Sequence, residues 1–279
     1  MVAEAKARAH FAELMSRSDP EIELDQAAMT IAQGEYEELE ALPYLRRLDE
    51  MASEVRPRLS PEESPERLVA ELNAYLFGEQ AFHGNAVDYY DPRNSYLNEV
   101  LDRRTGIPIT LSVVYMELAR RVGLTIEGVG LPGHFIVRCP AASNELLVDP
   151  FHQGAVLSQQ DCAERVRQQY GNSLRFTPEL LRPTTRREIV RRMLGNLKGS
   201  YLRRHDLVRA VRAVDWALLA DPSQPEDLRE RALLRFRLGD FRGSVHDLER
   251  YLEHGPRGAL AEQTRAQLRR VQDLWARRN

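Results

Sequence analysis

The chain has 279 residues, 43% hydrophobic and 29% charged, which is the balance of a folded globular protein long enough for one large domain or two smaller ones. It contains no run approaching the ~18 apolar residues of a membrane span and no apolar leader segment. Its two cysteines, Cys139 and Cys162, form neither a disulfide framework nor a metal-ligand spacing. We therefore expect a cytoplasmic protein with no membrane contact, no cofactor and no metal ion.

The net charge of −3 conceals an asymmetry between the two parts of the chain. Residues 1–181 carry 17 Lys and Arg against 29 Asp and Glu, a net −12, whereas residues 182–279 carry 22 against 13, a net +9. A basic, Arg-rich segment could bind nucleic acid or another anion. We favour the simpler explanation that these arginines lie on solvated helix faces or pair with the acidic part.

Residues 1–85 are predicted to form an acidic, all-helical segment that packs on the core. Helix-forming composition and apolar spacing predict helices over residues 3–16, over residues 24–32, from about Pro43 to Val55, and from about residue 60 through Leu76. Proline ends the third of these at Pro57, because its ring clashes with the preceding turn. Nothing in this segment indicates chemistry.

Residues 109–122 are predicted to form the central helix, because their apolar side chains point in nearly every direction around a helix. Pro108 starts this helix and Gly123 ends it. Three runs rich in Val, Ile and Leu follow, separated by turn residues, and predict strands over residues 126–131, 134–138 and 146–148. The short connections favour an antiparallel meander packed on the helix, which is an α+β architecture.

After a further helix predicted over residues 159–170, the chain repeats itself with an offset of 34 residues. Three alignments carry the repeat: His205-Asp206-Leu207 with Gly239-Asp240-Phe241, Leu218 with Leu252, and Pro222 with Pro256. This is the period of the tetratricopeptide repeat, although Arg235 stands where an aromatic residue is usual. A final helix over residues 260–275 would cap the stack. Such repeats form a groove that suits a protein or peptide partner.

His134 and Asp149 are the candidate catalytic residues. His134 stands at the start of one predicted strand and Asp149 at the end of the next, positions that lie side by side in an antiparallel hairpin. A carboxylate there can hold an imidazole in one tautomer and stabilise its charged form, as in a nucleophilic triad. The alternative is a purely structural hydrogen bond.

The stretch YYDPRNSYLNEVLDRRTGIPITLSVVYMELARRVGL, followed by LPGHFIVR and LLVDPF, resembles the transglutaminase-like core of the SirB-type bacterial family. That family joins this core to C-terminal tetratricopeptide repeats. The resemblance implies a transglutaminase-like (papain-like) core over residues 86–181, between the helical segment 1–85 and the repeats 182–279. It also implies a cysteine nucleophile at the start of the central helix, where the helix dipole favours the thiolate.

That position holds no cysteine, since the helix start reads GIPITLS, and matching the helix end to active relatives places the nucleophile near Pro108. Thr110 and Ser112 are the hydroxyl candidates, and we prefer to interpret both as polar residues of a helix start. Tyr90, Asn94 and Asn98 precede the helix and are candidates to line the same cleft. The alternatives are a core-covering tyrosine and a helix-capping asparagine.

Three functions follow from these patterns. We favour a catalytically degenerate transglutaminase-like protein that acts as an adaptor or regulator through its repeats. The alternative is a hydrolase or acyltransferase on peptide or amide bonds, which would use His134, Asp149 and either Thr110 or Ser112 as an unorthodox nucleophile. The third is nucleic-acid binding by the basic segment, which we disfavour because the repeat pattern accounts for that segment without it.

Overall fold

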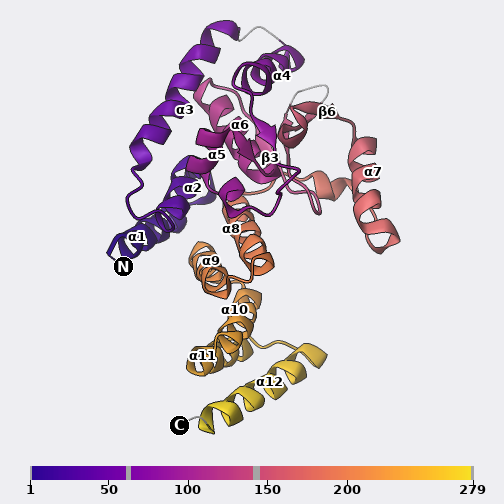
Figure 1. Ribbon diagram of the computed structural model, residues 1–279. Helices are drawn as coiled ribbons and strands as arrows, with labels where there is room; N and C mark the ends of the chain where they lie inside the picture. The colour runs from indigo at the N-terminus through magenta and orange to yellow at the C-terminus, as the bar shows by residue number, and fades with distance from the viewer. Residues whose placement is uncertain (1, 61–63, 141–144, 278–279) are drawn as a thin grey trace. The chain divides into compact units, whose positions relative to one another are not determined.

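The computed structural model describes residues 2–60, 64–140 and 145–277, and its mostly helical chain divides into two compact units. The first unit extends to Met193 and contains a small antiparallel sheet; the second begins at Leu194 and consists of helical repeats (Figure 1). Within the described ranges, every helix is too short or too polar to traverse a lipid bilayer.

The N-terminal segment is helical, as predicted, except that residues 83–84 form a strand, and residues 61–63 of the fourth predicted helix lie outside the described residues. Its helices are α1 (Val2–Ser16), α2 (Leu24–Gln33), α3 (Ala41–Val55) and α4 (Pro65–Asn73), which continues into a π-helical turn over Ala74–Glu79. Helix α3 ends two residues before Pro57, where the proline ring excludes a further α-helical turn. Helix α2 is buried along most of its length, so it forms part of the core.

Helix α6 (Pro108–Arg121) is the central helix, and it is buried on nearly every side. It contacts α2, α3, α5 (Leu97–Arg103) and the sheet (Figure 1). A two-stranded parallel ladder that we did not predict, β1 (His83–Gly84) with β2 (Thr105–Gly106), precedes its start. This ladder fixes where the chain enters α6.

The main sheet is an antiparallel meander with the predicted consecutive order. It consists of β3 (Glu127–Val129), β4 (Ile136–Cys139), β5 (Leu146–Asp149) and β6 (Ala155–Leu157), of which β6 was not predicted. Strand β4 begins two residues later than we expected, so His134 lies in the preceding turn rather than in the strand. The reason is local: Gly133 adopts a φ of +70° and His134 donates its backbone N–H to Leu131 O, which keeps the turn folded up to His134.

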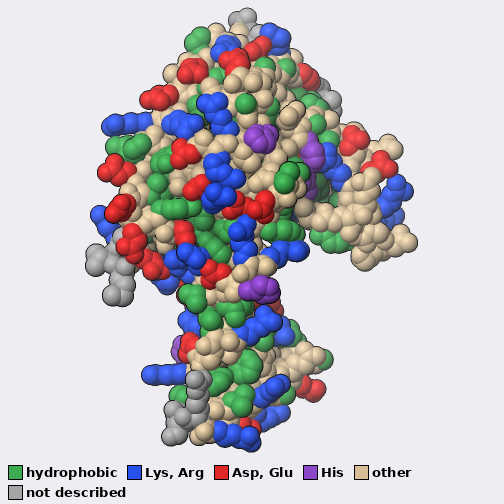
Figure 2. Space-filling view, in the orientation of Figure 1, with side chains coloured by type: hydrophobic (Ala, Val, Ile, Leu, Met, Phe, Trp, Pro, Cys, Tyr) green, Lys and Arg blue, Asp and Glu red, His purple; other side chains and the backbone are tan. Residues whose placement is uncertain are grey.

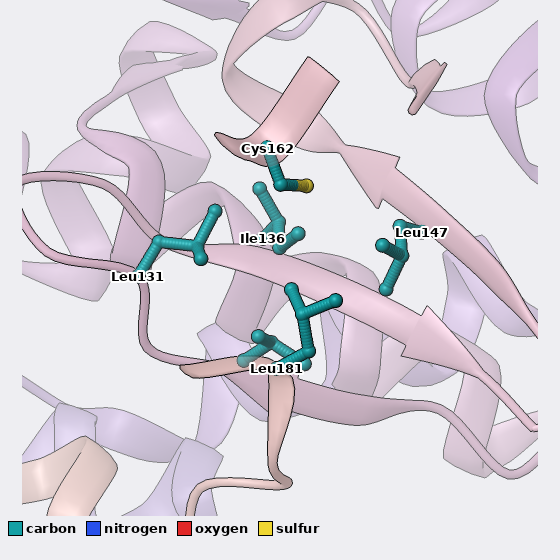
Figure 3. Packing of buried hydrophobic residues seen from close by; sticks show 6 residues of the cluster. Leu131, Ile136, Leu147, Cys162 and Leu181 are labelled. Atoms are coloured by element: carbon teal, nitrogen blue, oxygen red, sulfur yellow. The ribbon is translucent and has the colours of Figure 1, made fainter. Parts of the chain in front are cut away.

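A hydrophobic cluster joins the sheet to helix α7 (Gln159–Tyr170), which matches its predicted range. Figure 3 shows Leu131, Ile136, Leu147, Cys162 and Leu181 converging from the turn before β4, from the sheet, from α7 and from the connector that follows it. Each of these side chains is less than 9% exposed. Their burial holds α7 against the sheet and so determines which α7 side chains reach the end of β5.

The C-terminal unit has the helical repeats that the sequence predicted. Helix α8 (Arg186–Arg203) leads into α9 (Leu207–Ala220), α10 (Pro225–Arg237), α11 (Phe241–Glu253) and α12 (Gly258–Ala276). Residues 34 apart have the same local geometry: Asp206 and Asp240 each cap a helix, and His205 and Gly239 before them have φ values of +59° and +78°. The offset read from the sequence is therefore also a structural repeat.

Arg235 replaces the usual aromatic residue because it has a buried partner. The Asp247 carboxylate is fully buried, and it accepts hydrogen bonds from Arg231 and from Arg235, whose Nη1 lies 2.9 Å away. Arg231 also pairs with Asp215. At this position an ion-pair network thus takes the place of an aromatic contact between the helices.

A second buried ion cluster holds the N-terminal helices to α6. Asp25 of α2 and Glu117 of α6 are 2% and 1% exposed, and both accept hydrogen bonds from Arg121. Burial and the neighbouring Asp25 charge raise the pKa of Glu117, so its ionised form depends on the arginines.

We therefore expect Arg121→Met to lower the free energy of unfolding by about 3 kcal/mol, because it removes the more buried of the two arginines, Arg120 and Arg121, that Asp25 and Glu117 share. Urea unfolding followed by circular dichroism measures this loss. Arg46→Met is the matched control, since Arg46 is an exposed residue of α3. Equal losses in the two variants would contradict the role assigned to Arg121.

Candidate functional site

The site is centred on the carboxylate of Asp149, which is fully buried at the end of β5. Strands β4 and β5 pair with Val137 opposite Val148, so the turn before β4 lies beside the chain that follows β5. This register brings His134 Nε2 to 2.9 Å from Asp149 Oδ2. The His134 side chain keeps 14% of its surface exposed.

Two further side chains share the same carboxylate oxygen, and we had singled out neither from the sequence. His152 lies in the 3-10 turn Pro150–His152, and its Nδ1 is 2.7 Å from Asp149 Oδ2. Arg165 of α7 places Nη1 within hydrogen-bond distance of the same oxygen. His152 could have been predicted from the sequence, because it follows Asp149 by only three residues. No sequence pattern points to Arg165, because its position depends on how α7 packs.

The second carboxylate oxygen of Asp149 is held by the backbone. Asp149 Oδ1 accepts hydrogen bonds from the N–H groups of Phe151 and His152, at 3.1 and 3.3 Å. Burial by itself raises the pKa of Asp149, but the hydrogen bonds and charges of His134 and His152 outweigh it and lower that pKa to about 2. The carboxylate is therefore ionised at neutral pH.

Arg192 of α8 holds the turn that contains His134. Its Nη2 donates to the carbonyl oxygens of Leu131 and His134, both at 2.7 Å. In the same turn Gly133 needs its positive φ, and a Cβ there would lie 2.1 Å from the Gln169 side chain. Sequence reasoning missed Arg192, which lies 58 residues beyond His134 in the chain.

The start of α6 lies next to this site. Gly84 of β1 approaches Phe151 so closely that a Cβ would lie 2.5 Å from the Phe151 ring, and Gly84 pairs with Gly106 two residues before α6. Helix α6 also contacts the turn that carries His152. The helix end that bears the nucleophile in active transglutaminase-like enzymes is thus adjacent to the His134–Asp149 pair.

The two hydroxyl candidates at this helix start are both buried. Thr110 Oγ1 donates to Asn94 O at 2.7 Å and accepts from Ile107 N at 3.1 Å, so the hydroxyl caps the helix. Ser112 is fully buried, and its Oγ has no hydrogen-bond partner within the described part of the chain. In the same part of the chain, the His134 side chain is hydrogen-bonded to Asp149 and to neither of these hydroxyls.

The three predicted binding residues lie in different environments. Asn94 is fully buried and shapes the preceding loop, donating to Asp88 O at 2.8 Å and accepting from Asn85 Nδ2 at 3.1 Å. Asn98 is 5% exposed. Tyr90 is 40% exposed and stacks edge-on against Tyr89, which packs in turn on Phe151. Tyr90 is thus the accessible member of the three.

A pocket of about 300 Å³ opens beside His134. The rest of its lining is mixed. Apolar surface comes from Leu131, Pro132 and Val166, a guanidinium from Arg165, and two side-chain amides from Gln168 and Gln169. Its polar groups could orient a small ligand or one side chain of a peptide. Neither Asn94 nor Asn98 lines this pocket.

The two cysteines are buried in the core instead of lying at the helix start. Cys162 belongs to the cluster of Figure 3, and burial raises its pKa to about 11. Burial also raises the pKa of Cys139, at the end of β4. Both thiols are therefore protonated at neutral pH and poorly accessible.

We accordingly expect iodoacetamide near neutral pH to leave both thiols of the folded protein unmodified over a time in which both react in the urea-unfolded chain. Mass spectrometry of the intact protein counts the adducts. Rapid modification of one thiol in the folded protein, suppressed by His134→Ala, would instead identify an activated cysteine.

Comparison with known proteins agrees with the resemblance seen in the sequence. The family model of the transglutaminase-like superfamily matches residues 43–195, and a tetratricopeptide repeat model matches residues 197–269. No solved structure matches.

Relatives come from bacteria and from animals. A "UPF0162 protein" of Xylella fastidiosa is 38% identical over 87% of this chain and 88% of its own length. The "UPF0162 protein YchA" of Escherichia coli is 27% identical over 86% of each chain. Human "F-box only protein 21" is 33% identical over 60% of this chain and 28% of its own.

Proposed function

Because this chain belongs to the transglutaminase-like superfamily, as a relative of the UPF0162 proteins, and yet has no thiol at the start of α6, we propose that it is a non-catalytic member. In this proposal its tetratricopeptide repeats bind another protein, and the chain acts as an adaptor or regulator.

The start of α6 carries the first half of the proposal. The Thr110 hydroxyl already serves as a helix cap, and Ser112 is enclosed in the core. A serine or threonine nucleophile needs a base within hydrogen-bond reach, and in the described part of the chain neither hydroxyl is hydrogen-bonded to His134. In addition, Asp149 is shared with His152 and Arg165, whereas a triad carboxylate serves to orient its own imidazole.

The repeat unit supports the second half. A tetratricopeptide stack presents a groove of the size of a peptide or a helix. Residues 182–279 carry a net charge of +9, which would favour an acidic partner. Large apolar side chains are exposed on α9, on α10 and just after α10, namely Val208, Leu233 and Leu238. Such side chains could supply anchors for a partner.

Point substitutions in the full chain test this better than truncation. Residues up to Met193 belong to the first unit, and Arg192 holds the His134 turn, so a deletion from residue 182 would disturb both units. We expect a Val208→Ser, Leu233→Ser, Leu238→Ser triple variant to reduce capture of a protein partner from lysate at least about tenfold, through lost apolar contacts.

Quantitative mass spectrometry of the captured proteins measures this effect. The matched control is a Leu42→Ser, Val156→Ser variant, which removes exposed apolar side chains from the first unit. His134→Ala should also retain the partner. Retention of every partner by the repeat variant, or its loss in the control, would refute binding through the repeats.

One observation favours a second candidate, a hydrolase or acyltransferase of peptide or amide bonds. The His134–Asp149 pair is intact at 2.9 Å and borders a pocket of about 300 Å³. We expect no labelling by a fluorophosphonate probe, because among the described residues no accessible hydroxyl is paired with His134. Labelling that disappears in both His134→Ala and Ser112→Ala, read by in-gel fluorescence, would make the enzyme the better explanation.

Nucleic-acid binding has weaker support. Several basic side chains of the repeats are engaged in ion pairs within the unit, including Lys198 with Glu230, Arg209 with Asp206, and Arg231 with Asp247. On the visible face of α9 to α12, blue side chains are separated by hydrophobic and other side chains and do not merge into one patch (Figure 2). A continuous basic surface is the usual footprint of such binding.

A further inference from the structure

The hydrogen bonding around Asp149 Oδ2 is overcrowded. This single oxygen lies 2.9 Å from His134 Nε2, 2.7 Å from His152 Nδ1 and within hydrogen-bond distance of Arg165 Nη1. A carboxylate oxygen has two lone pairs, whereas three nitrogen groups approach it here. Oδ1 is separately occupied by the backbone N–H groups of Phe151 and His152.

The nitrogen–nitrogen contact in the cluster adds a conflict. Arg165 Nη1 lies 3.2 Å from His152 Nδ1, and a guanidinium can only donate. His152 Nδ1 would then have to accept from Arg165, although it must donate in order to bond Asp149 Oδ2. One ring nitrogen cannot do both in a single protonation state. The nitrogen atoms that meet at Asp149 Oδ2 therefore cannot all form hydrogen bonds at the same time.

We propose that His134, Asp149 and His152 form a binding site for a divalent first-row transition metal ion, with Zn²⁺ the best fit. Each of the three residues offers one ligand atom, and these atoms lie within 4.8 Å of one another. The atoms that meet in the structure are His134 Nε2, Asp149 Oδ2 and His152 Nδ1. Two imidazoles and one carboxylate are ligands that Zn²⁺ and related ions prefer, whereas Mg²⁺ and Ca²⁺ prefer oxygen ligands alone.

Binding requires only small movements. Metal–ligand bonds of about 2.1 Å place tetrahedral ligand atoms about 3.4 Å apart. Each ring nitrogen must therefore move slightly away from Asp149 Oδ2, from the present 2.9 and 2.7 Å, to admit the ion. His152 is the adjustable ligand, because its side chain is 51% exposed in a short turn. Arg165 is 31% exposed and can move its guanidinium toward the pocket beside His134.

The other two ligands are held in place. Arg192 bonds the carbonyl oxygens of Leu131 and His134, which fixes the His134 turn. The backbone donors on Oδ1 orient the Asp149 carboxylate so that Oδ2 faces the imidazoles. Loss of such an outer contact typically weakens metal binding about 10- to 100-fold. The fourth coordination position would be left for a water molecule or another small ligand.

Arg165 acts in this site as a competing cation. Its guanidinium contacts two of the three ligand atoms, so metal binding must displace it. Removal of its charge should therefore strengthen metal binding, while removal of a ligand should weaken it. A structural role for the cluster, in which Arg165 only stabilises the carboxylate, predicts no such opposite effects.

Isothermal titration of the metal-free full chain with ZnCl₂ tests the inference. We expect one Zn²⁺ per chain, no heat with MgCl₂, at least about tenfold weaker binding in His152→Ala, and about tenfold tighter binding in Arg165→Met. His246→Ala is the control, since that exposed histidine lies on α11 and should leave the affinity unchanged. Thermal melting without metal checks that each variant is folded.

His152→Ala is the decisive variant, because a half-exposed side chain can be removed without disturbing the core. It therefore tests the site even if His134→Ala fails to fold. No stoichiometric Zn²⁺ binding by the wild type, or equal affinity in the wild type, His152→Ala and Arg165→Met, would overturn the inference. The outcome is independent of the proposed adaptor function, since partner capture by the repeats can be measured on the same variants.

Discussion

The buried carboxylate of Asp149 is the constraint on which the site depends. An ionised carboxylate without exposure to water is stable only where donors surround it, and the donors here come from separate parts of the chain. The turn before β4 supplies His134, the turn after β5 supplies His152 and two backbone N–H groups, and α7 supplies Arg165. Satisfying one charge thus joins three segments of the first unit.

The neighbouring start of α6 has a different character. In active transglutaminase-like enzymes this helix end combines a thiol with the positive end of the helix dipole. Here Thr110 uses its hydroxyl to satisfy the backbone at the helix start, and Pro108 occupies the first turn. The His134–Asp149 pair therefore lies beside a helix start at which the Thr110 hydroxyl has a structural role.

The repeat unit is stabilised by a mixture of apolar packing and buried charge. Ala232, Val245, Leu248 and Val271 form a compact apolar cluster within it. Close to it, Asp247 is fully buried and depends on Arg231 and Arg235. A buried charge with two partners favours one arrangement of the helices over others, because any slip would leave it unpaired. This explains why the second repeat tolerates an arginine at an aromatic position.

Most of the fold and half of the site follow from the sequence by itself. Apolar periodicity determined the central helix, turn residues determined the meander, and the 34-residue offset determined the repeats, because these signals lie in neighbouring residues. The dyad of His134 and Asp149 followed from a resemblance to a known family and from the strand order. Edge strand β6 and the two-residue ladder were missed, since each has too few residues to carry a pattern.

Only the tertiary structure decided what surrounds the dyad. His152, Arg165 and Arg192 reach the site because of the pairing register of β4 with β5 and the packing of α7 and α8, which no local pattern records. The environment of the hydroxyls was decided in the same way: Thr110 is occupied by Asn94 O, 16 residues earlier in the chain. The sequence determined which elements form, and the convergence of their side chains depended on long-range packing.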